Sequence, residues 1–209
     1  MRKFTVFFLC SLFLVGTIIA GPGSAHALLL TGQDIIAAPA STADDSPGAE
    51  NTHQQAFNEM QNVYLTSDLA VDGGNILADT WVSSHMIFLN TASQSISSDV
   101  DKRWTFDDII LGVMSDRPGV LETASNSLLG APGTFYPGSF SARGMESGTY
   151  ADSYSVLTNS ITVTMHVSEP GDWIRVVTKA AQVPEPATML LLGMGLFGLA
   201  GFSRKKLKI

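Results

Sequence analysis

The sequence predicts a mainly β protein, an antiparallel β-sandwich (jelly-roll-like) with a short helix, between an N-terminal signal helix and a C-terminal hydrophobic helix. Short apolar or alternating runs, separated by turns rich in Gly, Pro and Asp, fill the middle of the chain. No long amphipathic helix and no internal repeat interrupts them. Residues 160–167 alternate apolar and polar side chains, which is typical of a half-buried strand.

Residues 1–27 have the three parts of a secretory signal peptide. Arg2 and Lys3 form a positive start, a nearly unbroken apolar run follows as far as residue 20, and Ala25 and Ala27 form a small-x-small cleavage site. We expect cleavage after Ala27. The single cysteine, Cys10, lies inside the apolar run, so the mature chain is expected to have no disulfide, no thiolate metal ligand and no cysteine nucleophile.

Residues 28–182 are long enough to form one exported domain around an ordinary hydrophobic core. Its first half is expected to contain, in order, an apolar segment at 28–40, an exposed loop at 39–52, a short helix or lead-in at 53–62, a strand at 63–71, a turn at 72–75 and an apolar strand region at 76–89. The turn prediction depends on Asp-Gly-Gly-Asn, a strong hairpin sequence.

The second half of this domain continues the pattern of short strands. We expect a polar loop at 93–101, a strand at 108–113, a turn at 115–119, an irregular connection at 126–144, a strand at 160–167, a tight turn at 169–172 and a last strand at 173–178. Because only a short turn separates the last two strands, we expect them to pair as a hairpin, with the last strand at its edge.

The charge of the chain is distributed unevenly. All but one of the 19 acidic residues lie within residues 28–182, whereas only half of the 12 basic residues do. Such an acidic surface repels phosphate backbones, so nucleic acid is excluded as a partner. It suits a solvated exported protein and is able to attract divalent cations.

Four aspartates crowd the stretch around Trp104: Asp99, Asp101, Asp107 and Asp108. Carboxylate oxygens near a loop are ligands that Ca²⁺ prefers. Their spacing does not match an EF-hand, and a solvated loop with the adjoining strand end is the competing interpretation. The four residues are therefore a candidate Ca²⁺ site, and we expect no other cofactor.

Catalytic motifs are missing from the middle of the chain. The mature histidines, His53, His85 and His166, lack the spacing of zinc ligands. Ser84 adjoins His85, but neighbouring residues on a strand point to opposite faces, and no Gly-x-Ser-x-Gly elbow is present. We therefore expect a protein that is not an enzyme.

Several aromatic residues are of the types that bind sugars by stacking. Most of them suit a sandwich core, but Phe135, Tyr136 and Phe140 lie in a segment rich in Gly and Pro, where aromatic side chains have less core to enter. This segment is the candidate ligand-binding surface.

The C-terminal segment, residues 183–209, is a separate unit. Two prolines precede an uncharged stretch at 188–202, and a basic cluster follows it. A helix over that stretch reaches roughly 22 Å, short of the ~30 Å hydrocarbon core of a bilayer, so it spans a membrane only marginally. Basic side chains beyond it snorkel to the headgroups and remain on the cytoplasmic side. We expect a stop-transfer helix in the inner membrane, with the domain outside.

This segment resembles the PEP-CTERM sorting signal of Gram-negative, exopolysaccharide-producing bacteria. The residues that carry the resemblance are Val183, Pro184, Glu185, Pro186, Arg204, Lys205 and Lys206, around a stretch rich in Leu and Gly. The resemblance implies an exosortase-type processing enzyme as a partner, acting near Pro-Glu-Pro, and a destination at the cell surface or in the extracellular matrix. The competing interpretation is a plain anchor that is never processed.

We therefore expect an exported, non-enzymatic surface or matrix protein associated with exopolysaccharide. One alternative is a carbohydrate-active hydrolase or lyase, which needs two carboxylates at a defined separation; Glu122 and Glu146 are an example of such a pair. The other alternative is a structural or adhesive module that binds protein through an apolar patch or a free strand edge.

Overall fold

The computed structural model describes residues 28–93, 95–148, 151–168 and 171–180, which belong to one structural unit, His26–Ala181. The expected signal peptide, with Ala25 and Ala27, and the sorting segment at 183–209 lie outside the described residues. The described residues form two large antiparallel sheets, a small hairpin and one helix. The predicted mainly β, sandwich-type fold is thus confirmed.

The first sheet has four strands in the order β1-β7-β10-β9, all antiparallel to their neighbours. They are β1 (Leu29–Thr31), β7 (Ser97–Phe106), β10 (Ser160–Val167) and β9 (Ser153–Leu157). β10 has the predicted bounds, and Ile161, Val163 and Met165 are buried as their alternation indicates. The period of two along this strand determines which of its faces meets the core.

The second sheet has the order β2-β6-β11-β8, with β3 also paired to β6. Its strands are β2 (Gln55–Asn58), β3 (Val63–Tyr64), β6 (Trp81–Leu89), β8 (Ile110–Met114) and β11 (Asp172–Lys179). Residues along almost the whole of β6 and β11 are buried. Continuous burial of this kind is typical of central strands that are covered on both faces.

A hairpin and a helix cover part of the second sheet. The hairpin consists of β4 (Leu69–Val71) and β5 (Gly74–Ile76), and the predicted turn joins them, with Gly73 at φ 74°. The helix α1 (Val120–Leu129) follows β8 after a turn. Leu129 of α1 and Val71 of the hairpin share a hydrophobic cluster with Val177 of β11, so these elements bury the face of the sheet that points away from the first sheet.

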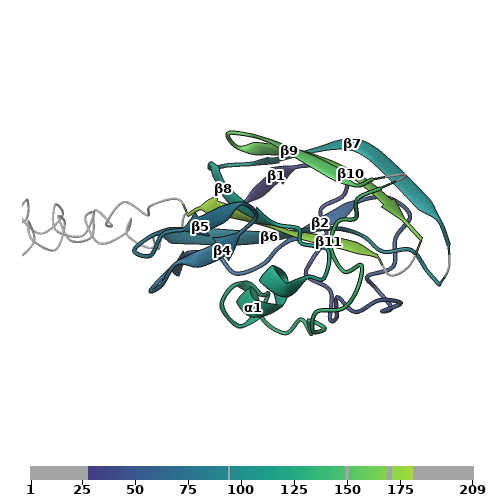
Figure 1. Ribbon diagram of the computed structural model, residues 1–209, viewed down its shortest axis with the longest axis horizontal. Helices are drawn as coiled ribbons and strands as arrows, with labels where there is room; N and C mark the ends of the chain where they lie inside the picture. Colours follow the sequence, from purple (N-terminus) through teal and green to yellow (C-terminus); the bar gives the residue numbers. More distant parts are fainter. Residues whose placement is uncertain (1–27, 94, 149–150, 169–170, 181–209) are drawn as a thin grey trace, which may run out of the picture. The chain divides into compact units, whose positions relative to one another are not determined.

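The main hydrophobic core lies between the two sheets, which Figure 1 shows as the β7-β9-β10 layer and the β6-β11 layer. Trp104 and Ile161 enter this core from the first sheet, and Ile87 and Ile174 enter it from the second. All four are completely buried. Burial of each such side chain stabilises the fold by about 1.5–3 kcal/mol, which makes this layer the principal source of stability.

The predicted hairpin between the last two strands is wrong. β10 pairs with β7 and β9 in the first sheet, whereas β11 pairs with β6 and β8 in the second. β11 is also a central strand and not an edge. The short connection after Val167 therefore carries the chain from one sheet to the other, a choice that depends on long-range pairing and not on the local sequence.

Two further elements differ from the prediction. Of the two expectations for 53–62, a short helix or a lead-in, the helix is wrong, because Gln55–Asn58 forms β2, which pairs with β6. The helix lies at Val120–Leu129 instead, and it includes the start of the predicted irregular connection. The predicted loop at 93–101 is also partly wrong, since β7 begins at Ser97. In each case pairing with a distant strand, or packing against one, overrides a weak local preference.

Candidate functional site

The four aspartates of the candidate Ca²⁺ site do not come together. Asp99 lies near the start of β7, whereas Asp107 and Asp108 follow its end. At about 3.3 Å per residue, Asp99 and Asp107 are roughly 26 Å apart along the extended chain. Among the described residues, only one set of three acidic side chains lies close enough together to hold a metal ion. That set contains none of these four aspartates.

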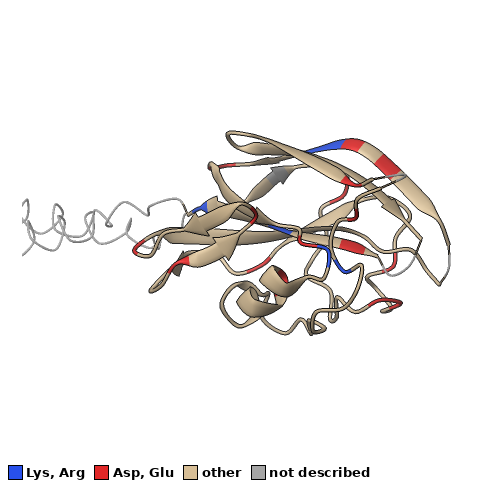
Figure 2. Cartoon of the chain, viewed as in Figure 1, with Lys and Arg blue, Asp and Glu red and all other residues tan. Residues whose placement is uncertain are grey.

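Two of these aspartates accept hydrogen bonds from the backbone of the domain. Asp99 is buried, accepts a hydrogen bond of 2.7 Å from the backbone N–H of Gln54, and pairs at 3.1 Å with Lys102. Asp108 accepts a hydrogen bond from the backbone N–H of Ile109. Acidic residues are spread over many strands and loops of the domain, as Figure 2 shows.

The three aromatic residues predicted to bind a ligand have different environments. Phe135 is exposed, with 63% of its surface accessible. Phe140 is half-buried, with the guanidinium of Arg143 5.7 Å from its ring centre. Tyr136 points inward, and its hydroxyl donates a 2.7 Å hydrogen bond to Glu59. The three side chains therefore do not form one aromatic surface. Phe135 is the most exposed of them.

A different aromatic pair is exposed on the second sheet. Tyr64 on β3 lies directly opposite Trp81 on the paired strand β6. Their ring centres are 5.1 Å apart, and the interplanar angle is 47°. Both remain more than two-fifths exposed. Asp79 accepts a 2.8 Å hydrogen bond from the Tyr64 hydroxyl, which raises the pKa of that phenol. Tyr and Trp rings, which combine an apolar face with a polar end, are enriched at interfaces, so this exposed pair is a candidate contact surface.

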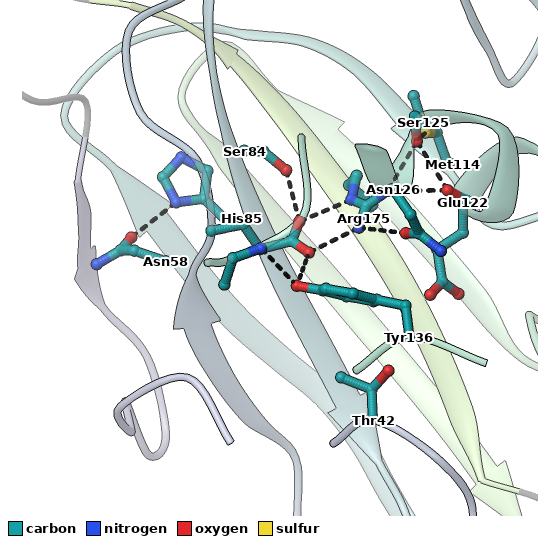
Figure 3. Close-up of polar contacts among 12 residues, drawn as sticks. Thr42, Asn58, Ser84, His85, Met114, Glu122, Ser125, Asn126, Tyr136 and Arg175 are labelled. Carbon is teal, nitrogen blue, oxygen red and sulfur yellow. Dashed lines mark hydrogen bonds and ion pairs between the residues drawn. The ribbon is translucent and has the colours of Figure 1, made fainter. Parts of the chain in front are cut away.

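The most extensive buried polar network joins β11 to α1 (Figure 3). Arg175 on β11 makes two 2.7 Å hydrogen bonds to the carboxylate of Glu59, and both side chains are completely buried. The same guanidinium donates to Ser125 and Asn126 of α1. Tyr136 completes the network, and burial, followed by the charge of Glu59, raises the pKa of its hydroxyl. Every hydrogen-bond partner of the Arg175 guanidinium is another protein group. The network therefore positions α1, and the guanidinium has no donor left for a ligand.

A second buried ion pair accounts for Glu122, one of the two carboxylates considered for glycoside hydrolysis. Arg143 donates two 2.9 Å hydrogen bonds to this carboxylate, and its guanidinium lies 4.4 Å from the ring centre of Trp173. Both partners of the pair are buried. Glu122 is thus engaged in packing the loop of Arg143 onto α1 and β11.

The candidate residues of a catalytic triad are also engaged separately. The hydroxyl of Ser84 donates to Glu59, so it does not face His85. His85 contacts Asn58 at 2.8 Å and Thr178 at 3.1 Å, and burial lowers the pKa of its imidazole to about 3. The third mature histidine in this part of the chain, His166 on β10, is half-buried and its ring contacts Ser98.

The structure instead brings together three carboxylates that the sequence does not group. One carboxylate oxygen each from Glu146, Asp152 and Asp172 lies within 4.8 Å of the others. A pocket of about 410 Å³ beside them is lined by Ser115, Asp116, Arg117, Met145, Glu146, Ser147, Asp152, Ser153 and Tyr154. We refer to Glu146, Asp152 and Asp172 as the carboxylate cluster.

Backbone contacts hold the cluster in place. Asp152 accepts hydrogen bonds from the backbone N–H groups of Glu146 (2.7 Å) and His166 (2.8 Å), which fixes the loop before β9 against β10. Glu146 also lies 3.5 Å from Arg117, an exposed side chain. Asp172, the first residue of β11, is completely buried, and neither of its carboxylate oxygens has a hydrogen-bond partner.

The electrostatics of Asp172 follow from this environment. Burial, followed by the negative charges of Asp152 and Glu146, raises the pKa of its carboxyl to about 9. Sequence reasoning missed the cluster because 20 residues separate Asp152 from Asp172 along the chain and no motif spans them. The only hint was the acidic composition of the domain.

No helix of the described residues has the length and apolarity needed to cross a membrane. Comparison with curated proteins and with solved structures finds no match for this chain. Residues 182–205 do match a known family, described as the PEP-CTERM protein-sorting motif. This match contains Val183, Pro184, Glu185, Pro186, Arg204 and Lys205, most of the residues on which the resemblance in the sequence depends. The chain is therefore an exported protein that carries a PEP-CTERM sorting motif for an exosortase-type system.

Proposed function

We propose that the protein is a non-enzymatic component of the cell surface or extracellular matrix, where its β-sandwich associates with exopolysaccharide. The observation that carries this proposal is the sorting motif at 182–205, which directs a protein through membrane anchoring to the cell surface. In the proposed pathway a signal peptide at 1–27 starts export, and cleavage near Pro184-Glu185-Pro186 releases the domain from its anchor.

The engagement of the candidate catalytic side chains supports a role without catalysis. Ser84, His85 and Glu122 are each buried and bonded to other protein groups. The exposed pair Tyr64–Trp81 supports contact with a polysaccharide, because aromatic faces stack on sugar rings and Asp79 is close enough to accept hydrogen bonds from hydroxyls. Phe135 is a second exposed aromatic residue that suits the same role.

Processing is tested in the native host with the Glu185→Ala variant and a matched Glu50→Ala variant, whose substitution lies in the exposed loop before β2. Mass spectrometry of the surface fraction determines the C-terminus. We expect wild type and Glu50→Ala to lose the Lys-Lys-Leu-Lys-Ile end and Glu185→Ala to keep it in the membrane fraction. Recovery of the intact end from wild type would indicate a plain anchor.

Glycan association is tested by co-sedimentation of the purified chain with the host's exopolysaccharide. We expect wild type to sediment, and the Tyr64→Ala/Trp81→Ala double variant to lose most of this binding, while Leu157→Ala, on the exposed outer strand β9, keeps it. Shortened polysaccharide in the supernatant would instead indicate a hydrolase or lyase. Absence of sedimentation would favour a structural or adhesive module that binds protein.

A further inference from the structure

The carboxylate of Asp172 has an unusual position for an acidic group. It is completely buried, yet no N–H or O–H group of the protein donates a hydrogen bond to either of its oxygens. Buried polar groups are almost always satisfied, and an unpaired buried carboxylate is costly. Asp172 also faces two other carboxylates, whose charges repel it. A missing positive partner is the simplest way to explain three acidic groups in one place.

The protein itself does not supply that partner among its described residues. Arg117 is the one basic side chain paired with the cluster; it contacts Glu146 at 3.5 Å and is 61% exposed. No described lysine, arginine or histidine forms an ion pair with Asp152 or Asp172. If all three carboxylates are ionised, their negative charge exceeds the single positive charge that Arg117 supplies.

We propose that Glu146, Asp152 and Asp172 form a Ca²⁺ site. Three oxygen ligands from carboxylates suit a hard cation, and the cluster has no imidazole or thiolate of the kind that selects zinc. Ca²⁺ takes six to eight oxygen ligands, and the pocket of about 410 Å³ beside Glu146 and Asp152 leaves space for water molecules to complete the shell. The same opening gives the ion a path from solvent.

The position of the cluster gives the ion a structural consequence. Asp152 immediately precedes β9 and is bonded to β10, both in the first sheet, whereas Asp172 begins β11 of the second sheet. A cation held by both aspartates links the two sheets at the point where the chain passes from β10 to β11. Ca²⁺ binding is therefore expected to stabilise the folded state, because the unfolded chain cannot present the three ligands together.

The competing explanation is a proton. Asp172 and Asp152 are close enough to share one, and burial together with the neighbouring charges raises the pKa of Asp172 to about 9. A shared proton would satisfy the pair without any metal. The two explanations make opposite predictions for the response to calcium, so an experiment separates them.

The test uses the full chain purified in a non-ionic detergent and stripped of metal with a chelator. Calcium chloride is titrated calorimetrically and thermal unfolding is followed with and without it, with magnesium chloride as the competing ion. The variants are Asp172→Asn and Glu146→Gln, and the matched control is Asp101→Asn, an exposed aspartate outside the cluster. Because Glu146 is half-buried, we expect Glu146→Gln to remain folded even if Asp172→Asn does not.

The proposal predicts saturable Ca²⁺ binding and a higher Tm for wild type and for Asp101→Asn. We expect Glu146→Gln and Asp172→Asn to bind Ca²⁺ roughly tenfold or more weakly, because affinity depends on the number of charged ligands. Three results would overturn the proposal: no calcium response of wild type, an equal response of wild type and Glu146→Gln, or equal binding of magnesium. If wild type shows no calcium response and Asp172→Asn is also more stable than wild type in chelator, the shared proton is the explanation.

Discussion

His85 is a fully buried imidazole whose two ring nitrogens both have partners. The oxygen of Asn58 also accepts a hydrogen bond from the backbone N–H of Leu29, which identifies it as an acceptor. The Nδ1 atom of His85 therefore carries the proton and donates it to Asn58, while Nε2 accepts from the hydroxyl of Thr178. The ring links β2, β6 and β11 in its neutral form.

Protonation of His85 is expected to destabilise the fold in acid. Its folded-state pKa of about 3 lies below the ordinary value of 6.5, so between these values the unfolded state binds more protons. The stability from the neutral ring is fully present above pH 6.5 and is lost as the pH falls towards 3, by at most about 1.4 kcal/mol per pH unit. NMR titration should show no protonation of this imidazole between pH 8 and pH 5. A ring that titrates near 6.5 would contradict the assignment.

Glu59 and Arg175 are expected to be the most sensitive ion pair to substitution. In the Glu59→Gln variant the guanidinium stays buried without its counter-charge, which should lower the free energy of unfolding by about 3–5 kcal/mol. Asp34→Asn is the matched control, since its partner His53 lies 3.6 Å away and both side chains are about two-fifths exposed; it should cost less than about 1 kcal/mol. Urea denaturation measures both, and equal costs would contradict the structural role of the buried pair.

At the scale of elements, the start of α1 depends on two residues that sequence analysis placed in a turn. Gly119 has φ 67° at the N-cap and offers no side chain to the helix. Asp116 replaces that cap, accepting hydrogen bonds from the backbone N–H groups of Val120 (2.7 Å) and Leu121 (3.0 Å). The turn thus initiates the helix, and the close approach of Arg143 explains why a glycine is needed there.

Substitution of Gly119 by Ala tests this geometry. An added Cβ atom would lie 2.5 Å from Cγ of Arg143, which Glu122 and Trp173 hold in place. Gly133→Ala is the matched control, because Gly133 also has a positive φ (84°) but no atom near the new Cβ. The control should cost about 1 kcal/mol through backbone strain, and Gly119→Ala at least about 2 kcal/mol, measured by denaturant unfolding. Equal costs would show that Arg143 moves away freely.

At the scale of the whole molecule, the domain contains its own source of stability. Residues described within 28–180 supply a core between the sheets, buried ion pairs and sheet hydrogen bonds. The C-terminal sorting segment is a separate unit in sequence and composition. Sorting and folding are therefore expected to be independent properties of this chain.

Deletion of residues 183–209 tests this independence. The shortened chain should keep the urea midpoint of the full chain, since the hydrophobic clusters described within 28–180 all remain in it. It should also leave the membrane fraction of the host, because it lacks the sorting motif. Urea denaturation of both purified chains and fractionation of the host measure the two effects. A lower midpoint would show that the tail contributes to the fold.

The sequence by itself predicted the features that depend on local patterns. The alternation of apolar residues in β10, the Asp-Gly turn of the β4–β5 hairpin and the mainly β class are confirmed because each depends on neighbouring residues. The sorting segment predicted at 183–209 is confirmed by the PEP-CTERM match at 182–205, because a sorting motif is a linear segment. Such features need no knowledge of which strands meet.

Only the tertiary structure decided the features that depend on distant residues. β11 was expected to return on β10, but it lies in the other sheet between β6 and β8. There the first sheet covers one of its faces, and α1 with the β4–β5 hairpin covers part of the other. The same change of sheet brings Asp172 beside Asp152 and Glu146, while β7 keeps Asp99 and Asp107 far apart. Whether carboxylates gather or separate is determined by strand pairing, which the spacing of acidic residues in the sequence does not encode.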